Sequence, residues 1–149
     1  MSRTIHAAPL PSTALDLLRR ADAELLAGQL SREPADVFSH AHLAALRAAA
    51  AVLAVRGMPA GRRAVRPVWQ LLATVAPETA DWATFFAAGA PLRLAVDAGR
   101  FDAVDAAHAE RTLCAAEDFL DEVRALLEAP RSGGADAPLA RPLHALQAS

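Results

Sequence analysis

The stretch that decides the fold is residues 34–57, PADVFSHAHLAALRAAAAVLAVRG. Proline suits the first turn of a helix, and Gly57 followed by Pro59 is typical of a helix end. Between them apolar residues recur at intervals of three and four, which predicts one long helix from Pro34 to Arg56. Alternating runs of β-branched or aromatic residues are missing from the chain, so we expect an all-α protein.

This central helix has two apolar sides when its residues are placed at about 100° intervals. The leucine side comprises Leu43, Leu46, Ala50 and Leu53. The alanine side comprises Ala41, Ala44, Ala48, Ala51 and Val55. The leucine side suits a bundle core. The alanine side permits close helix approach, so we expect on it either a second bundle helix or the identical helix of a partner chain.

A first helix precedes the central one. Thr13 and Asp16 resemble a capping box at its start, and Gly28 is expected to end it. Its apolar stripe consists of Ala14, Leu18, Ala21 and Leu25, widened by Leu15 and Leu26.

Two helices are expected between the central helix and the last one. A short helix begins near Pro67 and stops before Pro77, which starts the next helix. Gly89 and Pro91 are expected to break or kink that helix before Gly99 closes it.

Asp102 or Asp105 caps the last helix, whose predicted core positions are Ala106, Ala109, Leu113, Ala116, Leu120, Val123 and Leu127. The sequence therefore predicts an antiparallel bundle of about five helices over residues 12–129. A flexible N-terminus at residues 1–11 and a flexible tail at residues 130–149 flank this domain.

Several classes of protein are excluded. Stretches without charge, such as residues 67–77 and 82–92, have only about 11 residues, whereas a membrane-spanning helix needs roughly 20. The N-terminus lacks an apolar run with a cleavage site, so we expect a cytoplasmic protein. A single cysteine, Cys114, leaves no internal disulfide and no multi-cysteine metal site. We predict neither a cofactor nor a metal.

Arginines concentrate beyond the central helix. Arg56, Arg62, Arg63 and Arg66 lie within 11 residues, and all 15 basic residues of the chain are arginine. This segment is either a solvated connection between helices or a phosphate-binding patch, since guanidinium groups bind phosphate through paired hydrogen bonds.

The best candidate for chemistry is a polar strip along the central helix. Asp36 and His40 are one turn apart, so the carboxylate is placed to hold the imidazole, and Arg47 is placed to face a phosphate or carboxylate. The alternative is a water-facing edge of the helix. His40 and His42 point apart, which argues against a metal pair, and we expect His42 to be buried and hydrogen-bonded to a neighbouring helix.

Two sequence motifs carry a family resemblance. Residues 41–47, AHLAALR, and residues 82–90, WATFFAAGA, make the chain resemble a small actinobacterial family of HEPN domains over about residues 12–128. The resemblance implies a helical bundle, commonly dimeric, whose cleft meets nucleic acid or a nucleotide. His42 and Arg47 match this branch's own motif, which by itself gives no role, and we include His42 with the four arginines among the candidate ligand-binding residues.

The chain departs from the catalytic pattern of that resemblance. HEPN ribonucleases carry arginine and histidine separated by four to six residues, whereas Arg32 and His40, like Arg100 and His108, have seven between them. We therefore expect a non-catalytic module that binds RNA, a nucleotide or a protein partner through the arginine segment and the polar strip. The alternatives are a divergent metal-independent ribonuclease and a structural adaptor, and a homodimer is expected.

Overall fold

The computed structural model describes residues 9–57 and 67–129, and these are helical, with no strand among them. The α-helices are α1 (Ser12–Leu30), α2 (Pro34–Arg56), α3 (Val68–Val75), α4 (Ala80–Ala88), α5 (Ala90–Asp97) and α6 (Ala106–Glu128). Two 3-10 turns, η1 (Pro77–Thr79) and η2 (Phe101–Ala103), precede α4 and α6. The prediction of an all-α bundle is confirmed; the fourth expected helix is divided at Gly89 into α4 and α5.

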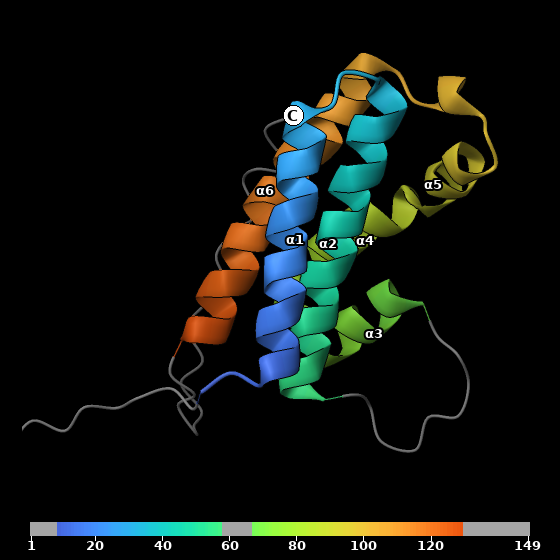
Figure 1. Ribbon diagram of the computed structural model, residues 1–149. Helices are drawn as coiled ribbons and strands as arrows, with labels where there is room; N and C mark the ends of the chain where they lie inside the picture. Colours follow the sequence, from blue (N-terminus) through green and yellow to red (C-terminus); the bar gives the residue numbers. More distant parts are fainter. Residues whose placement is uncertain (1–8, 58–66, 130–149) are drawn as a thin grey trace, which may run out of the picture.

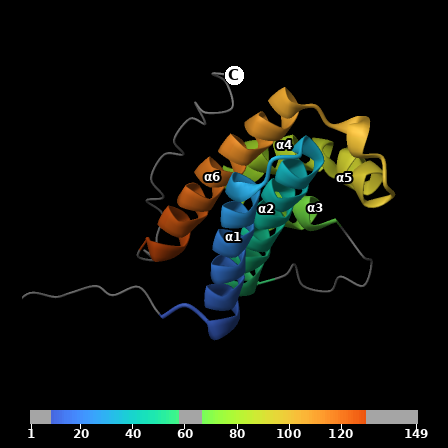
Figure 2. The same cartoon turned by 45° about the horizontal axis from the view of Figure 1, so that its top comes forward.

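The long helices α1, α2 and α6 form the body of the bundle, and α3 to α5 cover the side of α2 away from α1 (Figures 1 and 2). α1 runs antiparallel to both α2 and α6 (Figure 1). Side-chain hydrogen bonds connect α1 to α6. Arg124 donates two hydrogen bonds of 3.1 and 2.6 Å to Asp22, and Gln29 donates one of 2.7 Å to Glu117.

α2 has the bounds that the sequence predicts. Pro34 occupies its first turn, and Gly57 closes it with φ 90° and a backbone hydrogen bond to Leu53 of 2.7 Å. By length and composition α2 is apolar enough to cross a membrane, but 56% of its apolar window is buried inside the bundle. Packing around a central core helix accounts for that composition.

α1 differs from its prediction at both ends. It begins at Ser12 with no side-chain cap, so the capping box of Thr13 and Asp16 does not form. It also continues through Gly28 to Leu30, and Gly28 lies where α1, α2 and α6 approach closely. A Cβ added there would lie 3.3 Å from His40 Cβ and 3.4 Å from Leu113 Cδ1. Leu15 and Leu26 do not widen the core stripe; they are exposed.

The alanine side of α2 meets other helices of the bundle, which is one of the two alternatives that the sequence left open, and the leucine side contributes less to the core than expected. Its alanine side is buried within this chain, with Ala41, Ala48 and Ala51 at 0% exposure, against α1 and α6. On the leucine side Leu53 is buried, whereas Leu43, Leu46 and Ala50 are half-buried. Small side chains let three long helices approach one another, and the larger leucines remain at the margin.

Aromatic side chains fill the core between α2, α3, α4 and α6. The rings of Trp69 and Phe86 stack at 5.2 Å, and those of Trp82 and Phe119 lie 5.6 Å apart. The predicted core of α6 omits Phe119, which is fully buried, and wrongly includes Ala106, which is exposed. Asp105, one of the two expected caps, accepts a hydrogen bond of 2.8 Å from the His108 amide.

α5 and η2 rest on a second, smaller core at the start of α2. Its buried members are Ala35, Phe38, Val96, Val104 and Ala109. Leu94 and Phe101 project from this region with 70% and 65% exposure. The α5 region is thus held by fewer buried contacts than the three long helices.

Candidate functional site

His40 is held by a partner that the sequence did not indicate. Its Nδ1 donates to Glu24 Oε1 of α1 across 2.8 Å, and both side chains are partly buried. Asp36, the expected partner one turn away, is exposed. The pair forms because α1 lies alongside α2 at this level, which helical spacing within α2 cannot reveal. Glu24 is therefore the residue that sequence reasoning missed at this strip.

Arg47, the third residue of the predicted strip, is half-buried two turns beyond His40. Its Nε is buried and has no hydrogen-bond partner within the described residues. A guanidinium nitrogen removed from water without an acceptor carries a desolvation cost.

His42 points into the protein rather than toward a ligand. It is 3% exposed, its Nε2 donates to the backbone oxygen of Phe86 on α4 across 3.1 Å, and its ring stacks on Phe38 at 5.7 Å. The prediction of a buried imidazole bound to a neighbouring helix is confirmed. His40 and His42 face different neighbours.

The surroundings of His42 keep it neutral. Burial lowers its pKa below the ordinary value of 6.5; the Phe86 carbonyl opposes this shift, Arg93 strengthens it and Asp97 opposes it. Nδ1 of His42 and Nε of Arg93 are both buried without a hydrogen-bond partner within the described part of the chain, and Arg93 Nε forms an ion pair with Asp97 Oδ2 at 3.6 Å. Arg93 is a second residue that the sequence analysis did not single out.

Arg56 has a structural role. Its guanidinium binds Glu78 through contacts of 3.2 and 2.8 Å and also donates to the Val75 carbonyl at 3.2 Å. These bonds connect the end of α2 to the turn between α3 and α4. The other members of the predicted patch, Arg62, Arg63 and Arg66, lie outside the described residues.

Residues 9–57 and 67–129 contain no cluster of three histidine, cysteine or acidic side chains able to hold a metal ion. Cys114 is an exposed residue of α6 whose pKa is raised by burial of the thiol and by the nearby Glu117, Glu110 and Asp118. A raised pKa reduces the thiolate fraction, so this cysteine is a poor nucleophile.

The fold and these sites define a helical bundle built around one alanine-rich core helix. Residues 28–124 match the model of the SAV_6107-like HEPN family. That match covers more than half of the chain, and the protein belongs to this HEPN family. The resemblance given by AHLAALR and WATFFAAGA is thereby confirmed. No curated protein and no solved structure matches the chain.

Proposed function

We propose that this HEPN module binds a phosphate-bearing ligand, RNA or a nucleotide, through Arg62, Arg63 and Arg66. The observation that carries the proposal is the concentration of arginine in the segment that joins α2 to α3. Guanidinium groups bind phosphate oxygens with paired, charge-assisted hydrogen bonds. Neither Arg32 with His40 nor Arg100 with His108 has the spacing of a HEPN ribonuclease, which supports binding without cleavage.

The contacts of Arg56 remove it from the arginines that we propose to bind the ligand. Its guanidinium is already occupied by Glu78 and the Val75 carbonyl. Arg56 is therefore not counted among the ligand-binding residues, and the three later arginines supply the charge that a phosphate ligand requires.

Charge reversal tests this proposal. Fluorescence anisotropy with labelled single-stranded RNA, and competition by a nucleotide, are measured for the Arg62→Glu/Arg63→Glu variant over a range of salt concentrations. We expect the affinity to fall at least about tenfold. We also expect a shallower salt dependence, because each phosphate contact with single-stranded RNA contributes about 0.7 to the slope of log affinity against log salt concentration.

The chain offers a matched control. Arg19 and Arg20 are adjacent and exposed on α1, so Arg19→Glu/Arg20→Glu changes the net charge by the same amount elsewhere. We expect this variant to retain most of the affinity. An equal loss in both variants, or no loss in the first, would show that the arginine segment is not the binding site.

The contact between Glu24 and His40 supports one second candidate, a divergent metal-independent ribonuclease. A carboxylate on Nδ1 orients an imidazole so that Nε2 can accept a proton from a ribose hydroxyl. The test is incubation of labelled RNA with the protein and with His40→Ala. Cleavage that disappears in the variant supports this candidate, and cleavage no greater than that of the variant rejects it.

A homodimer remains a proposal, and the buried alanine side of α2 is not its seam. The apolar surface left on the long helices includes the half-buried Leu43 and Leu46 of α2 and the exposed Leu15, Leu26 and Leu30 of α1. Size-exclusion chromatography with light scattering tests the assembly. A strict monomer would leave the adaptor and dimer interpretations without support.

A further inference from the structure

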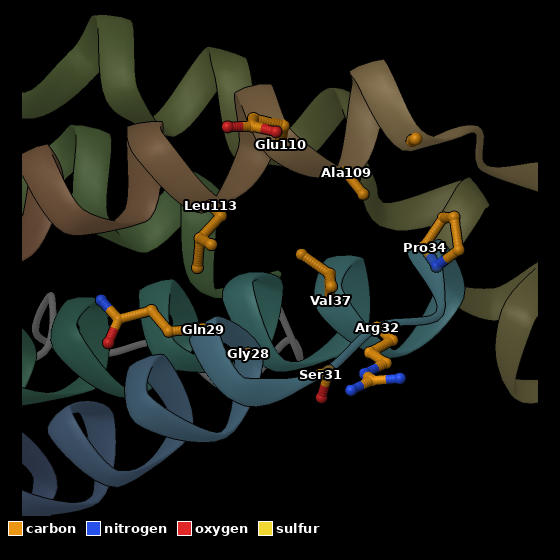
Figure 3. Close-up of a pocket in the computed structure, with 10 residues that line it drawn as sticks. Gly28, Gln29, Ser31, Arg32, Pro34, Val37, Ala109, Glu110 and Leu113 are labelled. Atoms are coloured by element: carbon orange, nitrogen blue, oxygen red, sulfur yellow. The ribbon is translucent and has the colours of Figure 1, made fainter.

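An open hollow of about 300 Å³ lies where the turn between α1 and α2 faces the first turns of α6 (Figure 3). Val37 of α2 and Leu113 of α6 project into the space between their helices, and Pro34 and Ala109 extend this apolar surface. A Cβ at Gly28 would lie 3.4 Å from Leu113 Cδ1, so glycine keeps the hollow open. Val37 and Leu113 are only half-buried. Apolar side chains placed against them would be removed from water together with this surface, which stabilises their binding.

The hollow lies at the opposite end of the bundle from Pro9, Gly57 and Ala129, where described segments begin or end. Because α1 runs antiparallel to α2 and α6, its start lies near the ends of those two helices (Figure 1). The hollow adjoins the end of α1 and the starts of α2 and α6. A segment that returns from Ala129 must therefore run back along α6, over about 30 Å at about 1.5 Å per residue.

Two of the three segments outside the described residues cannot bring a branched aliphatic side chain to the hollow. The N-terminal one contains a single such residue, Ile5, which reaches no more than about 14 Å from Pro9, half of the length of α1 of about 28 Å. The segment between α2 and α3 contains only Val65, which stays within about 7 Å of Pro67. Pro67 precedes α3, which covers the side of α2 away from α1 (Figure 1).

The C-terminal segment, residues 130–149, has both the length and the side chains. The chain from Ala129 to Leu139 spans about 33 Å when extended, which is enough to return along α6 to the hollow. Leu143 and Leu146 follow closely. The other apolar residues of this segment are alanine and proline, so these three leucines are the side chains suited to fill a hollow.

Charge favours the same path. Four acidic side chains lie along one face of α6 between the hollow and the end of the helix: Glu110, Glu117, Asp121 and Glu128. None of them forms an ion pair within the described part of the chain, and the partner of Glu117 is the neutral amide of Gln29. Residues 137–148 carry Arg141 and His144 and no acid, so this face attracts them.

We propose that residues 139–146 fold back along α6 and dock Leu139, Leu143 and Leu146 in the hollow. The leucines cover Val37 and Leu113, and Arg141 lies over the acidic face of α6. Residues 139–146 are then part of the folded domain, in contrast to the flexible tail that the sequence predicts. The docking surface is separate from the arginine segment proposed to bind phosphate.

The single cysteine of the chain provides the test. Cys114 is exposed and follows Leu113 directly, so a nitroxide attached to it lies beside the hollow without any substitution. Paramagnetic relaxation of the backbone amides is measured in the full chain. We expect the enhancement to rise from Arg131 toward residues 139–146, because the docked leucines lie closer to the label than the start of the segment does. Absence of this rise would overturn the proposal.

A mixture of two preparations identifies which chain supplies the segment. One preparation is isotope-labelled and carries no nitroxide, and the other carries the nitroxide without the isotope. We expect no enhancement at residues 139–146 in this mixture. An enhancement as large as that in the doubly labelled protein would mean that a second copy occupies the hollow, and would overturn docking within one chain.

Substitutions in the segment test the leucines. Leu139→Ser/Leu143→Ser/Leu146→Ser is expected to abolish the rise in relaxation. The matched control, Ala137→Ser/Ala140→Ser/Ala145→Ser, adds the same three hydroxyls but keeps the leucines, and should retain it. Without the nitroxide, the methyl chemical shifts of Val37 and Leu113 should change in the leucine variant and not in the control. Equal behaviour of the two variants would overturn the proposal.

Substitutions on α6 test the location. Ala106 lines the hollow and is exposed, so Ala106→Leu fills the hollow from its rim and is expected to displace the segment. Ala107 is also exposed but does not line the hollow, so Ala107→Leu adds the same side chain without blocking it. Retention of the relaxation rise in Ala106→Leu, or its equal loss in both variants, would reject the hollow as the docking site.

Discussion

The imidazole of His42 on α2 donates its Nε2 hydrogen to the backbone oxygen of Phe86 on α4, 3.1 Å away. The bond joins the central helix to the aromatic core near the place where α4 ends. Gly89 follows directly, and a Cβ there would lie 3.3 Å from His42 Cδ2. The contact explains both the burial of a polar ring and the small residue opposite it. It also makes the stability of the fold depend on pH.

We predict that acidification destabilises the protein through His42. Its folded pKa lies below the unfolded value of 6.5, so the unfolded chain takes up the proton first. The stability is therefore complete above the unfolded pKa and declines as the pH falls toward the folded pKa, by about 1.4 kcal/mol for each pH unit in that window. Urea unfolding from about pH 7 to about pH 5 measures this slope.

The control for this prediction is His42→Gln, which can still donate to the Phe86 carbonyl but does not titrate. Its unfolding free energy is expected to vary less with pH than that of the wild type. An unchanged slope would assign the pH dependence to groups other than His42.

We predict that enlarging the alanine side of α2 costs more than trimming its leucine side. Ala48 is fully buried, so Ala48→Leu forces extra atoms between closely packed helices and destabilises by about 1 to 3 kcal/mol. Leu43 is half-buried, so Leu43→Ala costs roughly 1 kcal/mol or less. Chemical denaturation of both variants compares the two sides. The opposite order would place the core on the leucine side.

We predict that any side chain at Gly57 lowers the stability of the protein, because of the backbone conformation at this residue. Its φ of 90° and ψ of 163° lie in a region essentially restricted to glycine, and a Cβ would meet nothing within 4 Å. Gly57→Ala therefore costs about 1 to 3 kcal/mol through backbone strain alone. Gly57→Asn should be no better, because asparagine tolerates the left-handed helical region rather than this one. Equal stability of either variant and wild type would contradict this account.

Arg56 is predicted to support stability more than ligand binding. Glu78 is desolvated, which raises its pKa, but its hydrogen bond and charge interaction with Arg56 outweigh this and lower the pKa overall. The contribution of the pair is therefore present above the unfolded pKa of Glu78 and is lost as the pH falls through the folded value. Glu78→Gln is expected to cost about 0.5 to 1 kcal/mol, since the pair is partly exposed.

The matching binding measurement separates the two roles of Arg56. Glu78→Gln should leave the affinity for RNA unchanged or slightly higher, because it frees a guanidinium without removing one. A fall in affinity would mean that the tie to Glu78 itself holds the binding surface in place.

Helix positions were readable from the sequence because their signals are local. Pro34 and Gly57 act on their own turns, and they fix the bounds of α2. The prediction that Gly28 ends α1 was wrong because the role of this glycine is set by His40 and Leu113, which pack against it from α2 and α6. The end of a helix is a local property, whereas the tolerance of glycine inside one depends on neighbours.

The candidate sites were less accessible to sequence reasoning for the same physical reason. Helical spacing placed Asp36 beside His40, but the acid that binds the imidazole is Glu24, 16 positions away on another helix. Arg56 belonged to an arginine run in the sequence, yet Glu78 of the turn between α3 and α4 binds its guanidinium. Such pairs form only after helices dock, and no pattern within one helix encodes them.

The sequence by itself determined that the chain is all-α, that α2 runs from Pro34 to Arg56, and that AHLAALR and WATFFAAGA resemble HEPN domains. Only the tertiary structure decided which side of α2 becomes the core. Both sides are apolar, so hydrophobicity could not choose between them. The choice follows from close packing, because the three long helices approach most closely over alanine and leave Leu43 and Leu46 at the margin.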